Sequence, residues 1–164
     1  MPVEPAITDV EQLKNRPELA ALLAWSSGAV QAAKFDRNEL TVWIERTALR
    51  DACRALMASE QKYDALMDVT CVDWYPKDPR FEVVYHLFST ATKRRVRLKV
   101  RLEDPDPSVD SLVPLWASAN FFEREVFDLF GIRFNEHPNL KRIMMPEGWD
   151  GHPLRKDYPV EGYR

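Results

Sequence analysis

Apolar and polar side chains alternate in several short stretches of this chain, which is the pattern of a β-strand with one buried face. In residues 39–45, Leu40, Val42 and Ile44 occupy every second position. The clearest case is "RRVRLKVRL" at 94–102, where valine and leucine alternate with arginine and lysine. Patterns of this kind predict five strands, near residues 29–35, 39–45, 65–74, 81–90 and 94–102.

Helices are predicted where apolar residues recur three or four positions apart and where capping residues precede them. "TDVE" at 8–11 has the form of a capping box, in which Thr8 caps the helix and Glu11 reaches back. Pro17 suits the first turn of the next helix, which ends at Ser-Ser-Gly. The remaining predicted helices begin at Thr47 and cover residues 111–118 and 120–130.

The last of these helices carries signals at both ends. Asn120 and Glu123 are placed to form a capping box at its start, and Gly131 stands where a left-handed C-cap is expected. Its apolar face is expected to hold Phe122, Val126, Leu129 and Phe130, and its polar face Glu123, Arg124, Glu125 and Asp128. Phe121 and Phe127 flank the polar face, and aromatic side chains mixed with charges are typical of a protein interface.

This order of elements predicts an α+β fold, a mostly antiparallel sheet of about five strands with helices packed on one face, followed by an extended irregular C-terminal arm. The last 34 residues contain four of the five glycines, show no periodicity, and still hold large apolar residues. We therefore expect an α/β domain at 1–130 and an arm at 131–164. The arm either folds back over its own domain or lies in a groove of another protein, and its length and irregularity favour the second.

Composition excludes several classes of protein. The chain has 164 residues, is 45% hydrophobic and has a formal net charge of -3, which suits one domain with no global attraction to nucleic acid. The N-terminal stretch has neither a cationic start nor an apolar core, so no secretory signal is expected. Cys53 and Cys71 match no metal or redox spacing and are expected to be core residues.

The basic stripe of residues 94–102 is the first candidate for binding. Arg95, Arg97, Lys99 and Arg101 share one face of the predicted strand and could serve an anionic ligand. The alternative is a solvated face neutralised by acids on neighbouring strands. No aromatic residue interleaves with these cations, so an acidic protein surface is favoured over nucleic acid.

No catalytic constellation is apparent. His86, His137 and His152 lack the spacing of metal ligands, and a structural role is favoured for each. The chain has no phosphate-binding glycine loop and no GxSxG motif. It therefore has the character of a protein that binds rather than one that reacts.

The end of the chain carries a more specific signal. "EREVFDLFGIRFNEHPNLKRIMMPEGWDGHPLRKDYP", residues 123–159, resembles the C-terminal signature of the C subunit of respiratory complex I, its 30 kDa subunit. Matching positions include Glu123–Glu125, Asp128, Phe130–Ile132, Phe134, His137–Pro138, Leu140, Arg142–Ile143, Gly151 and Pro153–Pro159. Two features depart from the family. Many members have Trp in place of Phe121, and many continue past Gly162 and Tyr163, which predicts a shorter arm here.

The resemblance implies a non-catalytic core subunit in the peripheral arm of a bacterial NADH:quinone oxidoreductase, at the cytoplasmic face of the cell membrane. It implies no cofactor on this chain, with FMN, iron–sulfur clusters, NADH and quinone in partner subunits. The implied partner is the large hydrogenase-like D subunit, which is called the hydrogenase-like subunit below, with other peripheral-arm subunits around it.

We expect the interface with the hydrogenase-like subunit to use the last helix and the arm, in which glycines permit turns and prolines limit the freedom of the unbound chain. Trp149, Leu154 and Tyr158 are expected as apolar anchors, and Arg155, Lys156 and Asp157 as charges that set the register. The full set of expected interface residues is Glu123, Arg124, Asp128, Phe134, His137, Arg142, Trp149, His152, Leu154, Arg155, Lys156, Asp157 and Tyr158.

Three alternatives remain open on the sequence. The first is the equivalent subunit of a membrane-bound hydrogenase, a formate hydrogenlyase or another quinone-reducing complex. The second is a free-standing anion-binding module that uses the stripe from Arg95 to Arg101. The third is an autonomous enzyme.

Overall fold

The computed structural model describes residues 5–162, so residues 1–4 and 163–164 lie outside the description. The N-terminal elements are α1 Val10–Leu13, α2 Pro17–Trp25, the 3-10 turn η1 Ser27–Ala29, β1 Val30–Asp36, β2 Glu39–Ile44, the 3-10 turn η2 Arg46–Ala48 and α3 Leu49–Ala58. The later elements are β3 Ala65–Asp73, β4 Phe81–Phe88, β5 Arg95–Leu102, β6 Ser108–Asp110, α4 Ala119–Phe130 and β7 Arg133–Asn135.

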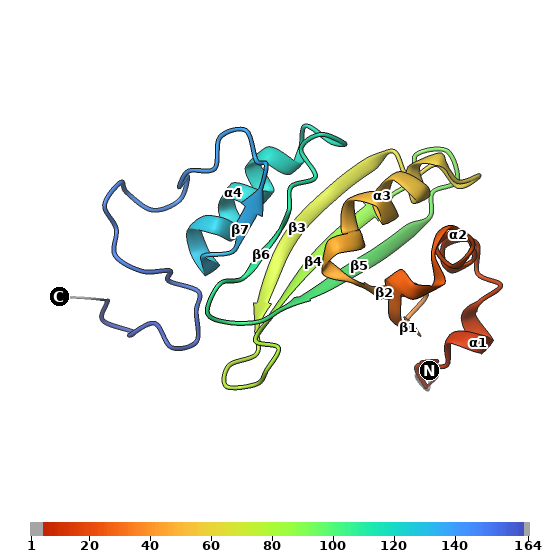
Figure 1. Ribbon diagram of the computed structural model, residues 1–164, viewed down its shortest axis with the longest axis horizontal. Helices are drawn as coiled ribbons and strands as arrows, with labels where there is room; N and C mark the ends of the chain where they lie inside the picture. The colour runs from red at the N-terminus through yellow and green to blue at the C-terminus, as the bar shows by residue number, and fades with distance from the viewer. Residues whose placement is uncertain (1–4, 163–164) are drawn as a thin grey trace.

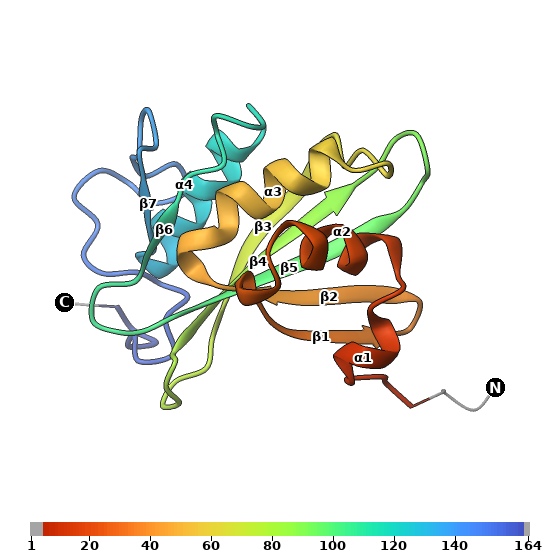
Figure 2. The same ribbon diagram turned by 45° about the vertical axis from the view of Figure 1, so that its right-hand side comes forward.

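Five strands form one twisted sheet in the order β1-β2-β5-β4-β3. All neighbouring strands are antiparallel except β2 and β5, which run parallel with Val42 opposite Leu98. The helices lie on one face of the sheet, and α4 packs beside β3 (Figures 1 and 2). The structure thus confirms the predicted α+β fold, and each predicted strand agrees with an observed strand to within two residues at either end.

The core lies between the sheet and the helices. Alternate residues of β5, from Val96 to Leu102, are at most 1% exposed and face it, as the sequence pattern predicts. Cys53 and Leu56 of α3 are fully buried in the same cluster, which extends through Ile132 and Phe134 beyond the end of α4. The buried face of β5 is entirely aliphatic, and the cations alternate with these residues on its opposite face.

The helix predicted at 111–118 does not form. Residues 108–110 form the short strand β6, which pairs in parallel with β7, and the segment after it is a series of turns. Pro114 disfavours helical geometry at the residue before it and supplies no N–H group. Ser111 is fully buried and donates its hydroxyl to Glu123, so the chain here is held by a side-chain contact instead of a helix.

The predicted helix caps are also different. In α1 the cap is Asp9, whose carboxylate accepts from the N–H of Glu11, so Thr8 is not the capping residue. In α4 the N-cap is Ser118, and Asn120 and Glu123 make no capping box. α3 begins at Leu49 after η2, with no side-chain cap.

The polar face assigned to α4 is wrong at two positions, since Glu123 and Asp128 are fully buried. The predicted C-cap is confirmed, because Gly131 adopts the left-handed conformation with φ 74°. Residues 136–162 contain no helix or strand and run back along α4 (Figure 1).

Candidate functional site

Asp128, in the last turn of α4, anchors the first part of the arm. Its Oδ2 accepts from the backbone N–H groups of residues 143, 144 and 145 at 2.9, 2.7 and 2.9 Å, and its Oδ1 accepts from Arg142 at 2.9 Å. Successive N–H groups directed at one point form a concave anion site. Burial alone would raise the pKa of Asp128, but these donors hold it below its ordinary range.

Further contacts join the arm to the side of α4. Arg142 also donates to the carbonyl of Gly151 at 2.9 Å, which draws together two parts of the arm. From the helix, Arg124 donates to the carbonyls of residues 141 and 142, at 3.0 and 3.4 Å. Both arginines therefore bind backbone of the arm itself.

The second half of the arm caps the C-terminus of α4. The last carbonyls of a helix have no partner within it and attract cations. Here the carbonyl of residue 128 accepts from His152 Nδ1 at 2.9 Å, that of 129 from the N–H of Leu154 at 3.0 Å, and that of 130 from Arg155 Nε at 2.6 Å. Burial lowers the pKa of His152, so the ring is neutral near pH 7 and carries its proton on Nδ1.

Gly131 makes this cap possible for two reasons. Its φ of 74° is one that other residues adopt only with strain. In addition, a Cβ at this position would lie 2.6 Å from the ring of His152 and 2.8 Å from Arg155. The glycine therefore both turns the chain and leaves room for the arm.

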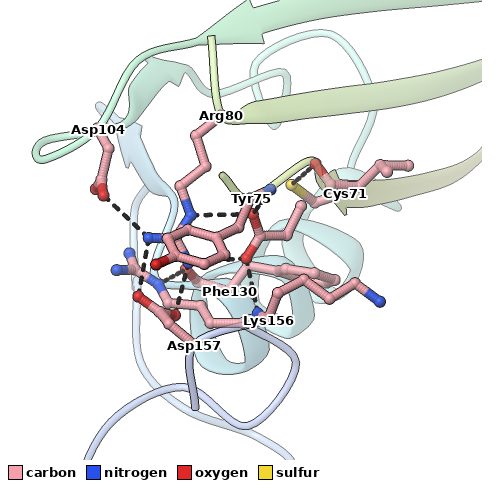
Figure 3. A network of polar contacts seen from close by, with 10 residues as sticks. Cys71, Tyr75, Arg80, Asp104, Phe130, Lys156 and Asp157 are labelled. Carbon is pink, nitrogen blue, oxygen red and sulfur yellow. Dashed lines mark hydrogen bonds and ion pairs between the residues drawn. The ribbon is translucent and has the colours of Figure 1, made fainter. Parts of the chain in front are cut away.

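The arm then reaches a third anchor at Arg80, the residue before β4 (Figure 3). The Arg80 guanidinium is 6% exposed and donates two hydrogen bonds to Asp73, two to Asp157 and one to Asp104, all between 2.6 and 3.0 Å. The N–H of Lys156 donates to Asp73 as well, at 2.8 Å. One buried arginine thus binds three carboxylates from three separate segments, a group that we call the Arg80 cluster.

Electrostatics favour this arrangement. Burial alone would raise the pKa of Asp73, but Arg80 and the N–H groups of Lys156 and Tyr75 lower it to about 2. The hydrogen bond from Arg80 likewise lowers the pKa of Asp157. Both carboxylates are therefore ionised at neutral pH, and the cluster stays intact there.

Glu123 belongs to a separate buried group beneath the start of the arm. Its carboxylate accepts from Ser111 Oγ and from the N–H of Leu112, both at 2.6 Å. Burial raises the pKa of Glu123 to about 7 in spite of these two bonds. The Nε2 of His137 lies 3.9 Å from it and 3.3 Å from the carbonyl of Asn120.

Apolar side chains remain exposed on the anchored arm and on the adjoining helix. Trp149 is 40% exposed and Leu154 49%, while Met144 and Phe121 are exposed by more than half. Each of these lies on or beside a backbone fixed by the contacts above. Large exposed apolar groups on an ordered surface are typical of protein interfaces.

The thirteen expected interface residues differ in whether their side chains are buried, bound to the chain itself or exposed. Glu123, Asp128 and Phe134 are buried within the chain, so their side chains are not on its surface. Arg124, His137, Arg142, His152, Arg155, Asp157 and Tyr158 bind carbonyls or charged groups of the chain itself. Lys156 does so through its backbone, and Trp149 and Leu154 keep exposed side chains.

Sequence reasoning missed the domain side of the Arg80 cluster. Asp73 continues the core-facing alternation of Val69 and Cys71, and a carboxylate at such a position signals a buried partner. No comparable pattern marks Arg80 or Asp104, which lie in loops.

The basic stripe of β5 is largely neutralised, as the alternative prediction has it. Arg97 pairs with Glu39, and Lys99 with Glu82 at 2.6 Å. Arg101 lies 3.8 Å from the same Glu82 and, like Lys99, over the ring of Trp43. Arg95 alone of the four makes no ion pair within residues 5–162 and lies over Phe88.

Metal and thiol chemistry find little support in the described part of the chain. Among residues 5–162 there is no group of three or more His, Cys, Asp or Glu side chains placed to hold a metal ion. Burial raises the pKa of Cys71 to about 12 and that of Cys53 further, so both are thiols without nucleophilic character. In the same residues no helix is long and apolar enough to cross a membrane.

Comparison with known proteins identifies the family. Residues 42–164 match the family model described as respiratory-chain NADH dehydrogenase, 30 Kd subunit. The chain belongs to this family. It is 51% identical over 149 residues to the C subunit of NADH-quinone oxidoreductase of Geobacter sulfurreducens, covering 90% of this chain and 91% of that one. It is 46% identical to the protein of the same name in Roseiflexus castenholzii, covering 90% and 86%.

Solved structures agree with this assignment. A trypsin-resistant fragment of Nqo5 is 30% identical, with a TM-score of 0.65 over 75% of this chain and 99% of the fragment. A chain of the membrane-bound sulfane sulfur reductase, an archaeal respiratory membrane complex, has a TM-score of 0.71 over 87% of this chain and 84% of that one. Its identity of 24% establishes a shared fold alone. The family model and the Nqo5 fragment thus both support the fold of the 30 kDa subunit.

Proposed function

We propose that this chain is the architectural 30 kDa subunit in the peripheral arm of a bacterial NADH:quinone oxidoreductase, at the cytoplasmic face of the membrane. It has no active site and no cofactor of its own. FMN, iron–sulfur clusters and the sites for NADH and quinone belong to its partners. Its part in electron transfer is to hold the hydrogenase-like subunit in place.

One observation carries this proposal: the arm is anchored at Asp128, at the end of α4 and at Arg80, yet leaves Trp149 and Leu154 exposed. A fixed backbone lowers the entropy that binding would otherwise cost, about 1–2 kcal/mol per ordered residue. Aromatic and aliphatic side chains held in this way are suited to be the central contacts of an interface. The anchoring residues set the position of this surface and need not touch the hydrogenase-like subunit.

The same fold occurs in the sulfane sulfur reductase, so the fold does not distinguish between electron donors, and the names of the related sequences support NADH as the donor. Relatives that are 51% and 46% identical both bear the name of the NADH-quinone oxidoreductase C subunit. The function in a hydrogenase or formate hydrogenlyase is accordingly the weaker of the two hypotheses.

Co-purification of the hydrogenase-like subunit tests the proposal. Trp149→Glu places a charge on the arm, and Trp25→Glu is a matched control, because both indoles are 40% exposed and Trp25 lies at the end of α2. We expect the first variant to lose the partner and the second to retain it, with equal melting temperatures. Undiminished recovery of the partner with Trp149→Glu would contradict the proposed docking surface.

A further inference from the structure

A basic pocket of about 560 Å³ lies between the tips of two hairpins, the β1–β2 turn and the β4–β5 turn. Figure 2 shows both turns at the side of the molecule opposite the C-terminal arm. The cationic residues that line the pocket are Arg16, Arg37, Lys93, Arg94 and Arg95. Neither the C-terminal arm nor the Arg80 cluster contributes a residue to the pocket.

The carboxylates in this pocket are already neutralised. Glu18 binds Arg94 at 2.5 Å, and Glu39 binds Arg97 of the neighbouring strand. Within the described part of the chain, the other four cations form no ion pair; Arg16 lies over the ring of Phe35 and Arg95 over that of Phe88. Asp36 and Asp64 attract Arg37 and Lys93 from outside the pocket without forming ion pairs with them. The lining itself therefore has an excess of positive charge.

Backbone geometry gives independent support. Arg37 and Lys93 have φ values of 49° and 59°, in the left-handed region that favours glycine. Glycine at either hairpin tip would be less strained, yet both positions carry cations that line the pocket. Strained conformations at non-glycine residues cluster at functional sites. Lys62, with φ 47°, has the same geometry but does not line this pocket, so it provides a comparison.

We propose that the pocket is a second docking site, which binds an acidic segment of a partner protein presenting two or more neighbouring carboxylates. Cations on two separate hairpins suit carboxylates spaced along a peptide. Many phosphate sites combine cations with glycine turns or with free N–H groups at a helix N-terminus. The N-terminus of α2 borders the pocket, but Pro17 has no N–H and Glu18 already places a carboxylate there.

The site goes beyond the proposed contact with the hydrogenase-like subunit, because it lies at the other end of the molecule. A docking site at this end would let the chain contact a second partner protein, so that it connects two partners instead of binding one. Electrostatic attraction of this kind acts mainly on the rate of association and on the choice of partner, and it weakens as salt increases.

Fluorescence anisotropy of a labelled hexaglutamate peptide with the full chain tests this proposal at low ionic strength. Lys93→Gly and Lys62→Gly form a matched pair, because each removes one lysine at a left-handed position. We expect Lys93→Gly to weaken binding about fivefold or more, and Lys62→Gly less than twofold. Both should raise the melting temperature by about 2–4 °C, since glycine relieves the strain. Arg37→Gly should behave like Lys93→Gly.

Several results would overturn the proposal. One is equal weakening by both lysine variants, which would mean unspecific attraction by net charge. A second is the absence of peptide binding by the wild type at low salt. A third is displacement of the peptide by sodium tripolyphosphate at a concentration far below that of free hexaglutamate, which would indicate a phosphate site. The assay uses this chain alone, so a failure here is distinct from a failure of the arm to dock on the hydrogenase-like subunit.

Discussion

Asp128→Asn should release the first part of the arm from α4. The wild-type carboxylate accepts three backbone N–H groups on Oδ2 and Arg142 on Oδ1. An asparagine keeps one oxygen for the N–H groups but directs its own NH2 group at Arg142. Hydrogen bonds to charged groups contribute about 1.5–3 kcal/mol each, and here one is lost and three are weakened. A cost of about 3 kcal/mol follows, which corresponds to roughly 150-fold in the opening equilibrium.

Hydrogen exchange measures this opening directly. The amides of residues 143–145 should exchange roughly 150-fold faster in Asp128→Asn than in the wild type, while those of β4 and β5 keep their protection. Glu125→Gln is the control, because Glu125 is an exposed carboxylate of the same helix and binds none of these groups. Unchanged exchange at 143–145 would refute the reasoning that the carboxylate holds this loop.

The pH dependence of the same contact has a definite sign. The pKa of Asp128 is lower in the folded chain than in the unfolded one. Its contribution is therefore complete above the unfolded value, about 3.9, and is lost as pH falls through the folded value. The arm should stay anchored throughout the neutral range.

Three further predictions concern the other contacts. Asp157→Asn should free the end of the arm from the Arg80 cluster and speed tryptic cleavage after residue 156 several-fold, whereas Asp104→Asn, on the domain side, should leave that cleavage nearly unchanged. The pKa of Glu123 is raised to about 7 in the folded chain, so the stability of the wild type falls as pH rises from about 4.5 to 7. Glu123→Gln should therefore be more stable than the wild type at pH 8, by about 1–3 kcal/mol in urea unfolding. This advantage should disappear below pH 5. Gly131→Ala should lower stability by at least about 2 kcal/mol, since it combines a strained φ with a 2.6 Å contact to His152, and thermal unfolding measures the loss.

The fold was predictable because its signals are local. The alternation of apolar and charged residues at 94–102 predicts a strand without any knowledge of the neighbouring strands, because its buried face consists of aliphatic residues alone. The glycine at 131 is similarly explicit, since few other residues end a helix in the left-handed conformation.

The positions of Glu123 and Asp128 could not be predicted in the same way. Helical periodicity says which face a residue occupies, not whether a distant segment covers that face. Here residues 111–112 and 142–145 cover the polar side of α4 and supply donors, so two carboxylates become buried. The sequence favours an arm that lies on another protein, whereas the arm contacts its own domain. Arg80 binds Asp157, and Asp73 accepts from the N–H of Lys156, and nothing in the sequence identifies these residues of the arm as the partners.

The cap at the end of α4 has a consequence for biosynthesis. Residues 128–130 are translated more than twenty residues before residues 152–155, whose groups bind their carbonyls. The helix therefore leaves the ribosome with an unfinished end, and the growing chain completes it only after residue 155 has emerged. A chain truncated before that point would leave these three carbonyls to water, while residues 142–145 could still bind Asp128.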